Sequence, residues 1–282
     1  MHRIVVIMHE KDRSLRNGAQ KSTYLVSALA PHWRRMGHSV RVAFGIDNLP
    51  EADLAILHVD LSVTPEIYLR AAARYPVVVN GDARDIRKRL VSRNVLGSGD
   101  HWPGPVIVKS DLNNGGIPER LRATGRCGDS ADVRRVHASG FNRYQVWNSL
   151  AQVPAAVFTN RRLVVERFLP ERHGEFSAIR SWGFLGDRER CRRFLKADPI
   201  VKGQGLVPDE LVEVPAAIRA ERKRLGFDYG KFDFVLHDGE PVLLDANRTP
   251  GAPPRFVDAE FDAVLADLAG GLESIVAARR AR

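Results

Sequence analysis

The stretch from Lys231 to Gly251, KFDFVLHDGEPVLLDANRTPG, constrains the fold more than any other part of the sequence. Apolar and polar residues alternate in its first half, the pair Asp238-Gly239 interrupts the alternation, and a second apolar run, Val242 to Leu244, follows. Two such runs joined by an Asp-Gly pair are typical of a β-hairpin. We therefore expect two antiparallel strands here.

Three oxygen-bearing side chains lie toward one end of this hairpin. Asp233 is on the first strand, while Asp245 and Asn247 lie two apart on the second, so these two share one face. Carboxylate and amide oxygens suit Mg²⁺, which leaves much of its octahedron to nucleotide phosphates. Acids that merely flank turns are the alternative, but an unpaired carboxylate directly after three apolar residues would be costly. We predict a metal site formed by these three residues.

The composition is that of an ordinary globular protein, with 282 residues, 44% of them hydrophobic and 27% charged. This length is enough for two or three modest lobes. No apolar run approaches the length of a membrane span, and the N-terminal run IVVIM is too short for a secretory signal. Cys127 and Cys191 have no metal-ligand spacing. We expect a cytoplasmic protein, no membrane partner and two inert thiols.

The net charge of +9 raises the possibility of a nucleic-acid partner. However, the basic residues are spread along the chain, and no stretch alternates basic with aromatic residues as a stacking platform would. A small polyanion such as ATP, or an acidic substrate, is equally compatible with the charge. Only 8 of the 43 basic residues are lysines. A lysine in a structured segment is therefore less easily explained as part of the general positive charge of the chain.

The residues FDF followed by LLDANRTPG resemble the metal-binding end of the ATP-grasp superfamily, namely an acid on one strand and acid-x-Asn-x-x-Pro-Gly at the end of another. Members of this superfamily hold ATP between two α+β lobes and commonly join a carboxylate to an amine or thiol through an acyl phosphate. The resemblance, in particular to the glutathione synthetase and RimK-like branch, implies an α/β fold of three parts. These are an N-terminal Rossmann-like lobe (residues 1–82), a first ATP-grasp lobe (83–165) and a second one (166–282).

The first part of the chain alternates strand and helix patterns. Strands are expected at 3–8, 39–44, 52–59 and 77–80, and helices at 22–36 and 65–75. This order predicts βαβ units and a parallel sheet, whose ligands bind beyond the carboxyl ends of the strands. No G-x-G-x-x-G follows the first strand, so a dinucleotide site is unsupported. The candidates for an acceptor-substrate site, with a solvated loop as the alternative for each, are His9, Glu10, Lys11, Arg16, Asn17, His58 and Asp60.

A strand is expected at 104–109, ending in Lys109, and Gly115-Gly116 follows after a short polar segment. This order resembles the superfamily strand whose lysine reaches the α- and β-phosphates and the loop that closes over them. Glycines let backbone N–H groups approach phosphate oxygens, and neighbouring asparagines can adopt left-handed conformations. An ordinary turn after a strand is the alternative. The resemblance also implies a phosphate role for Lys88, in a helix predicted over 81–96, although a surface position is equally compatible.

The strand predicted over 162–169, RLVVERFL, resembles the linker between the two ATP-grasp lobes. The resemblance implies that Glu166, Arg167 and Leu169 border the adenine. It also implies that Glu175, with Glu171 as the second choice, meets the ribose. An edge strand with charged residues facing water is the alternative, and it suits Glu171 better than Glu166. Residues 120–150 carry few apolar anchors and show the weakest pattern in the chain.

The second half of the chain holds further cationic candidates for phosphate contacts. Arg180 lies on a strand predicted over 175–185, and a planar bidentate donor suits a γ-phosphate or acyl phosphate. Lys196 and Lys202 flank a loop that is expected near the phosphates or the substrate, and Arg248 lies beside the metal ligands. Helices are expected at 210–225 and 256–278.

The order of these motifs predicts an ADP-forming ligase that uses ATP with Mg²⁺, or with Mn²⁺ as an alternative. Lys109 would neutralise phosphate charge, and Arg248 would orient the carboxylate or the transferring phosphoryl group. The partners would be a carboxylate and an amine, either small molecules or peptides, and a homo-oligomer is compatible with the sequence. A non-catalytic ATP-binding protein on the same fold and a basic nucleic-acid-binding protein are the alternatives. Retention of all three metal ligands argues against both.

Overall fold

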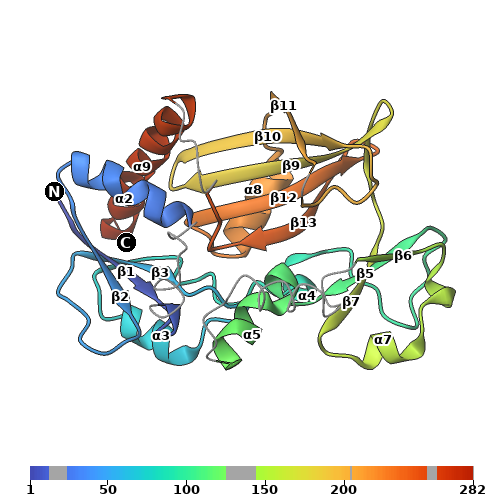
Figure 1. Ribbon diagram of the computed structural model, residues 1–282, viewed down its shortest axis with the longest axis horizontal. Helices are drawn as coiled ribbons and strands as arrows, with labels where there is room; N and C mark the ends of the chain where they lie inside the picture. Colours follow the sequence, from blue (N-terminus) through green and yellow to red (C-terminus); the bar gives the residue numbers. More distant parts are fainter. Residues whose placement is uncertain (13–23, 125–143, 204, 253–258, 282) are drawn as a thin grey trace.

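The computed structural model describes residues 1–12, 24–124, 144–203, 205–252 and 259–281 (Figure 1). Its first sheet is parallel, with the order β2-β1-β3-β4. The strands are β1 (Arg3–Met8), β2 (Ser39–Phe44), β3 (Leu54–His58) and β4 (Val77–Val79). Both faces of β1 are covered, so its residues 4–8 form a continuous buried run. The parallel sheet predicted from the alternation of elements is confirmed.

Helices cover both faces of this sheet. On one face, Ile4, Val6 and Met8 pack with α2 (Leu25–Arg35) and with α9 (Ala259–Arg280) from the end of the chain. On the other face, Val5 and Ile7 pack with α3 (Glu66–Ala72). Figure 1 shows α2 and α9 lying side by side near the two termini. The last helix therefore completes the core of the first sheet, and the predicted lobe boundaries stay a prediction.

The hairpin lies in a six-stranded antiparallel sheet, which Figure 1 shows in yellow to orange. The path is β11-β10-β9-β12-β13, and β8 pairs with β9. The strands are β8 (Glu171–His173), β9 (Phe176–Leu185), β10 (Arg188–Lys196), β11 (Val207–Leu211), β12 (Tyr229–His237) and β13 (Glu240–Asn247). Helix α8 (Ala216–Arg224) covers one face, where Trp182, Phe184 and Phe232 are buried. Asp238 and Gly239 form the hairpin turn with φ of 52° and 84°, as the Asp-Gly pair predicts.

A three-stranded antiparallel sheet, β6-β5-β7, lies below the larger sheet in Figure 1. Its strands are β5 (Val106–Ser110), β6 (Gln145–Trp147) and β7 (Leu163–Arg167). Short helices surround it, namely α4 (Lys88–Val91), η1 (Asn113–Gly116), α5 (Ile117–Thr124), η2 (Leu150–Gln152) and α7 (Ala155–Thr159). The poorly patterned region is thus described only at its two ends, and Cys127 lies outside the described residues.

Two of the predicted helices are wrong in extent. The helix expected over 81–96 is reduced to α4, because backbone groups on either side of it pair with other segments: Ile86 N–H with Ser62 O, and Leu96 N–H with Val165 O. The helix expected over 210–225 begins only at Ala216, because residues 207–211 pair with β10 as an edge strand. Pairing with distant segments replaces helical hydrogen bonds in both places.

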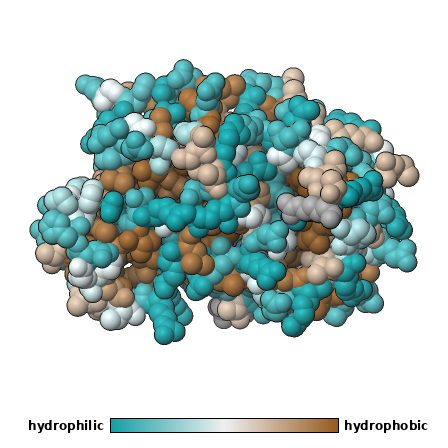
Figure 2. Space-filling model, turned by 180° about the vertical axis from the view of Figure 1, so that it is seen from behind, coloured by the Kyte–Doolittle hydropathy of each residue, from teal (hydrophilic) through white to brown (hydrophobic). Residues whose placement is uncertain are grey.

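The surface of the protein mixes residue types. On the side seen in Figure 2, hydrophilic residues lie among hydrophobic ones. Among the residues that the structure describes, no helix is both long and apolar enough to cross a membrane. Cys191 is buried, and burial raises the pKa of its thiol to about 12, as expected for an inert cysteine.

Candidate functional site

A cavity of about 400 Å³ lies between the three-stranded and the six-stranded sheet. Its walls include the apolar side chains of Ile107 from β5, Leu169 from the segment after β7, Ile179 from β9 and Phe194 from β10. Its charged part is formed by lysines and carboxylates from both sheets. The volume is in the range of small-molecule sites. An apolar section that continues into a charged one suits a ligand with a flat ring and an anionic tail.

The metal-ligand candidates lie in rows across the six-stranded sheet. Asp233 on β12 is paired in register with Asp245 on β13 and with Ser181 on β9. Ser181 Oγ donates a hydrogen bond of 2.8 Å to Asp233 Oδ1. In the next row Lys231 is paired with Asn247, and Lys231 Nζ lies 2.9 Å from Asp233 Oδ2. Residues paired in register or two apart on a strand share a face, so the predicted convergence of the three oxygen ligands is geometrically consistent.

A β-bulge makes this arrangement possible. The register shifts between Asp233 and Phe234, so Leu244 is an extra residue on β13. Leu243 packs in the core beneath α8, whereas Leu244 and Asp245 both line the cavity. Strict alternation from Leu243 would turn Asp245 toward the core. The bulge therefore aims the carboxylate at the cavity, as bulges beside functional sites do.

Lys88 neutralises Asp245. The side chain of Lys88 is 3% exposed, and its Nζ lies 3.1 Å from Asp245 Oδ1. Burial opposes the charged forms, but the attraction between the two groups outweighs it, raising the pKa of Lys88 and lowering that of Asp245. Asp245 Oδ1 nevertheless accepts no well-aligned hydrogen bond from the described residues. A buried carboxylate oxygen on a sheet face that also carries Asp233 and Asn247 fits a hard divalent cation. Asp233 and Asp245 line the cavity, whereas Asn247 does not.

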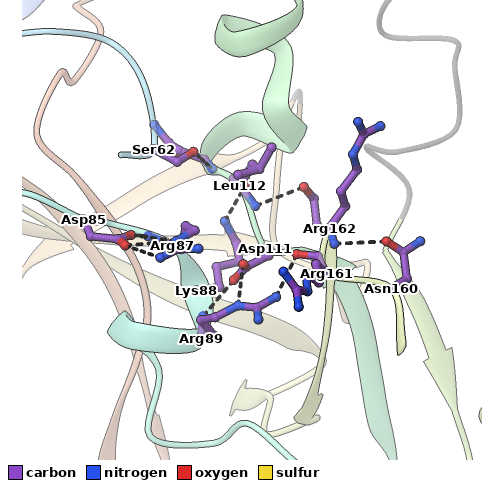
Figure 3. Close-up of polar contacts among 12 residues, drawn as sticks. Ser62, Asp85, Arg87, Lys88, Arg89, Asp111, Leu112, Asn160, Arg161 and Arg162 are labelled. Atoms are coloured by element: carbon purple, nitrogen blue, oxygen red, sulfur yellow. Dashed lines mark hydrogen bonds and ion pairs between the residues drawn. The ribbon is translucent and has the colours of Figure 1, made fainter. Parts of the chain in front are cut away.

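Contacts of α4 hold Lys88 in this position, and Figure 3 shows them. The backbone N–H of Lys88 donates to Asp111 O at 2.9 Å, and its Nζ lies 3.4 Å from Leu112 O. The neighbouring Arg89 forms a 2.6 Å ion pair with Asp111, which is completely buried. The short helix is thereby fastened to the end of β5, and Lys88 is directed inward instead of lying on the surface.

Lys109 and Glu166 form a second buried ion pair in the cavity. Lys109 Nζ lies 2.6 Å from Glu166 Oε2, while Glu166 Oε1 has no hydrogen-bond partner in the part of the chain that the structure describes. The Tyr144 ring lies near two ammonium groups, 5.9 Å from Lys109 Nζ and 4.1 Å from Lys202 Nζ. Burial, and next the charge of Lys88, lower the pKa of Lys202. Half of the eight lysines of the chain thus surround Glu166, Asp233 and Asp245.

Gly115 and Gly116 do not line the cavity. They end the turn η1, in which Asn114, Gly115 and Gly116 have φ of 45°, 65° and 72°, whereas Asn113 is not left-handed. A Cβ on Gly116 would lie 2.9 Å from Leu112 Cδ1. The turn approaches the hairpin through Asn113, whose Nδ2 is 3.5 Å from Asn247 Oδ1. The glycines therefore shape a tight turn beside the metal-ligand candidates.

The two arginines predicted to act on phosphate have other partners. Arg180 is in phase with Trp182 and so lies on the face of β9 opposite to Ser181, where its Nη2 donates to Glu171 Oε1 at 2.8 Å. Arg248 is 1% exposed and lies against three backbone carbonyls, with Nη1 donating to Ala83 O at 2.7 Å. The other two carbonyls belong to Val59 and Leu61. Neither guanidinium lines the cavity in this structure, and the predicted phosphate roles of both arginines stay predictions.

The segment predicted to border the adenine comprises the end of β7 and the residues that follow it. Glu166, Arg167 and Leu169 all line the cavity, and the Arg167 guanidinium lies 4.8 Å from the Trp102 ring centre. Glu175 is exposed and does not line the cavity. Glu171, the second choice, is held by Arg180 and by the backbone N–H of Leu236 at 2.7 Å. Neither carboxylate is therefore placed to meet a ribose in this structure.

Those acceptor-site candidates of the first lobe that the structure describes lie outside the cavity wall. His58 is completely buried, which lowers its pKa to about 3. Asp60 accepts from Tyr24 Oη at 2.7 Å and from Thr249 Oγ1 at 2.9 Å. Lys11 Nζ donates to Arg122 O at 2.6 Å, His9 is half-buried and Glu10 is exposed. Arg16 and Asn17 lie outside the described residues.

Several residues of the site were not singled out from the sequence, among them Tyr144, Ser181, Lys231 and Leu244. Lys231 had a signal, because it lies two residues before Asp233 and so shares its face. Tyr144 lies at the edge of the poorly patterned region, and no signal in the sequence connected it with the site. Lys196, which was predicted to flank a substrate loop, donates to Lys202 O at 2.7 Å and so anchors the loop that carries Lys202.

No family model and no curated protein matches the sequence. Solved structures do match along the chain. The D-alanine–D-alanine ligase from Coxiella burnetii has a TM-score of 0.54 at 11% identity, covering 100% of this chain and 98% of that one. A RimK domain protein, described as ATP-grasp, from Sphaerobacter thermophilus DSM 20745 has a TM-score of 0.53 at 14% identity, covering 97% and 99%. The D-alanine–D-alanine ligase from Bacillus anthracis has a TM-score of 0.51 at 13% identity, covering 100% and 99%.

Proposed function

From the ATP-grasp fold, which this chain has, we propose an ATP- and Mg²⁺-dependent, ADP-forming ligase that joins a carboxylate to an amine. One observation carries the proposal. Asp233 and Asp245 face each other across the hairpin at the charged part of a cavity whose remaining walls are largely apolar. That combination suits a nucleotide whose base is enclosed and whose phosphates meet a metal ion.

The apolar part of the cavity would hold the adenine. Ile107 and Ile179 come from opposite sheets, and Leu169 lies between them in sequence on the connecting segment. Apolar side chains from two sheets provide flat walls, and the backbone of the connecting segment provides a donor and an acceptor for the edge of the base. Specific recognition would then rest on backbone groups near Leu169.

The charged part would hold the triphosphate. Asp233, Asp245 and Asn247 would bind Mg²⁺, which would supply neutralisation of the charge on the β- and γ-phosphates. Lys109, Lys88 and Lys231 already lie beside carboxylates here. Their ammonium groups would balance the phosphate charge as point charges.

The chemistry would proceed in two displacements. A substrate carboxylate oxygen attacks the γ-phosphorus and the bond to the ADP oxygen breaks, giving an acyl phosphate. The amine then attacks the acyl carbon, phosphate leaves, and the amine loses a proton. The residues of the chain contribute positioning and fixed charge, so no covalent nucleophile is needed.

Calorimetry of ATP binding with and without Mg²⁺ tests this function. We expect native binding to strengthen with Mg²⁺ and Asp245→Ala plus Asn247→Ala to remove that gain. Glu175→Ala is the matched control, because this carboxylate is exposed and lies off the cavity. Native protein that is folded yet binds no ATP would overturn the proposal and favour a nucleic-acid partner. ATP binding without ADP release, across a screen of carboxylate and amine pairs, would favour the non-catalytic alternative.

A further inference from the structure

The hydroxyl of Thr249 lies between two acceptors. Thr249 Oγ1 is 2.9 Å from Asp60 Oδ1 and 3.2 Å from Asn247 Oδ1, and Thr249 is 3% exposed. A hydroxyl has one proton, and neither a carboxylate oxygen nor an amide oxygen can return one. The hydroxyl therefore donates its hydrogen bond either to Asp60 or to Asn247. This choice decides how much accepting capacity Asn247 retains.

The geometry favours Asp60. It offers the shorter contact, and a hydrogen bond to an ionised acceptor is stronger than one to a neutral amide. Asp60 is also held from its other side, because its Oδ2 accepts from Tyr24 Oη at 2.7 Å and lies 3.5 Å from Arg122 Nη2. These contacts fix the carboxylate, so its Oδ1 stays directed at Thr249.

The accepting capacity of Asn247 Oδ1 is limited. An amide oxygen has two lone pairs, and the backbone N–H of Thr249 uses one of them at 2.9 Å. The amide of Asn113, at 3.5 Å, lies beyond the usual range of a hydrogen bond. A Thr249 hydroxyl turned toward Asn247 would occupy the second lone pair, whereas one turned toward Asp60 leaves it for a cation.

We propose that Asp60 is a positioning residue of the metal site. Because Asp60 accepts the hydrogen bond that the Thr249 hydroxyl donates, a lone pair of Asn247 Oδ1 stays available to the divalent ion. The proposal rests on the proposed function, because it requires Asn247 to be a metal ligand. It also connects two parts of the molecule. Asp60 follows β3 of the first sheet, and the backbone of Leu25 binds Pro250 O at 2.8 Å in the same region.

A double-mutant cycle separates this role from simple packing. The probe is Mn²⁺, whose free fraction is measured by electron paramagnetic resonance in the presence of the protein and a non-hydrolysable ATP analogue. Asp60→Asn should weaken Mn²⁺ binding about tenfold while Thr249 is present, because the amide lets the hydroxyl proton turn to Asn247. In a Thr249→Val background, which has no such proton, Asp60→Asn should have no further effect. Thr249→Ser should behave as the native chain does.

Tyr24→Phe is the matched control, since it removes one hydrogen bond to the other oxygen of Asp60 but keeps the carboxylate itself, the Arg122 contact that also holds it, and Thr249. It should lower thermal stability and leave Mn²⁺ binding within about twofold of native. Binding of the analogue without metal reports that the cavity is intact in each variant. If Asp60→Asn does not fold, Asp60→Ser, which also lacks the carboxylate, repeats the cycle with the same expectations.

Equal weakening by Asp60→Asn in the native and the Thr249→Val backgrounds would overturn the positioning role, as would no weakening in either. Asn247→Ala distinguishes this failure from failure of the metal site itself. If Asn247→Ala weakens Mn²⁺ binding and Asp60→Asn does not, only the positioning role is lost. If Asn247→Ala has no effect, the metal ligands of the proposed function are wrong as well.

Discussion

Glu166 and Glu171 lie close together in the sequence, both are buried, and each is paired with a cation, yet their surroundings differ. Glu171 is saturated, since Arg180 donates to both of its oxygens and the backbone of Leu236 adds a further bond. Glu166 has Lys109 on one oxygen, and its other oxygen lacks a partner among the described residues. Glu166 lines the cavity and Glu171 does not.

The comparison separates two uses of a buried ion pair. A pair whose bonding capacity is filled holds segments together, and here it joins β8, β9 and β12. A pair with capacity left over can change partners when a ligand enters. Asp245, like Glu166, lines the cavity, although its ion pair differs, because Lys88 Nζ lies 3.1 Å from Oδ1, the same oxygen that accepts no well-aligned hydrogen bond from the described residues. Substitutions at the two kinds of pair should therefore affect different measurements.

Arg180→Met should have the largest effect, and on stability alone. It leaves the Glu171 carboxylate buried without its counter-charge, which typically costs about 3 to 5 kcal/mol of unfolding free energy. ATP affinity should stay within about twofold of native, because the pair lies off the cavity. Urea unfolding measures the stability, and calorimetry measures the ATP affinity.

The double variant Arg180→Met with Glu171→Gln should regain most of the stability, because the amide still accepts from Leu236. A loss of ATP affinity in that folded double variant would contradict the structural role.

Lys109→Met with Glu166→Gln should show the opposite pattern. Removing both charges together leaves no unpaired ion, so we expect unfolding free energy to change by no more than about 1 kcal/mol. ATP affinity should fall about 100-fold, or ~2.7 kcal/mol, because the ammonium group proposed to contact phosphate is gone. Calorimetry with ATP and with adenosine makes the test sharper. Adenosine has no phosphates, so its affinity should fall much less than that of ATP and reports only the effect of Glu166→Gln at the predicted base site. An equal loss for both ligands would show that damage to the base site, and not loss of the phosphate contact, is responsible.

The hairpin was predictable because its signals are local. The Asp-Gly turn and the alternation around Asp233 depend only on neighbours in sequence, and so did the face shared by Asp233 and Lys231. The face of Arg180 could also have been assigned, because it is in phase with Trp182 and Phe184 and therefore belongs to the apolar face beneath α8. A lone arginine on a strand should be placed by its phase before it is given a ligand.

Features that depend on distant partners were not predictable from the sequence alone. The bulge at Leu244 is visible only in the register of β12 and β13, although it decides that Asp245 faces the cavity. Residues 81–87 resemble part of a helix until Ser62 is known to bind the backbone of Ile86. Arg248 follows a predicted metal-ligand motif, but its guanidinium is bound by carbonyls from segments more than a hundred residues earlier. Local periodicity carries no information about such pairings.

His58 extends the comparison to a buried group with no counter-charge in contact. Its substitution should have the smallest effect of the three, a change in the pH dependence of stability. Neither ring nitrogen has a hydrogen-bond partner among the described residues, and burial lowers the folded-state pKa from 6.5 to about 3. Above the unfolded pKa the ring is neutral in both states and contributes no pH dependence. As the pH falls from 6.5 toward 3 only the unfolded state binds the proton, so stability is lost progressively. At about pH 5 the loss amounts to about 2 kcal/mol relative to about pH 7.5.

The variant that tests this loss is His58→Phe, which keeps an aromatic ring against Tyr24, whose ring centre lies 4.8 Å away. Urea unfolding at the two pH values should show the phenylalanine variant losing about 2 kcal/mol less than the native chain. Asp12 titrates in the same window, since burial raises its pKa to about 6, and it acts in the opposite direction. Both proteins retain Asp12, so the difference in their pH-dependent loss of stability isolates the contribution of His58. An identical pH dependence of the two proteins would show that the ring reaches water or a partner before it is protonated.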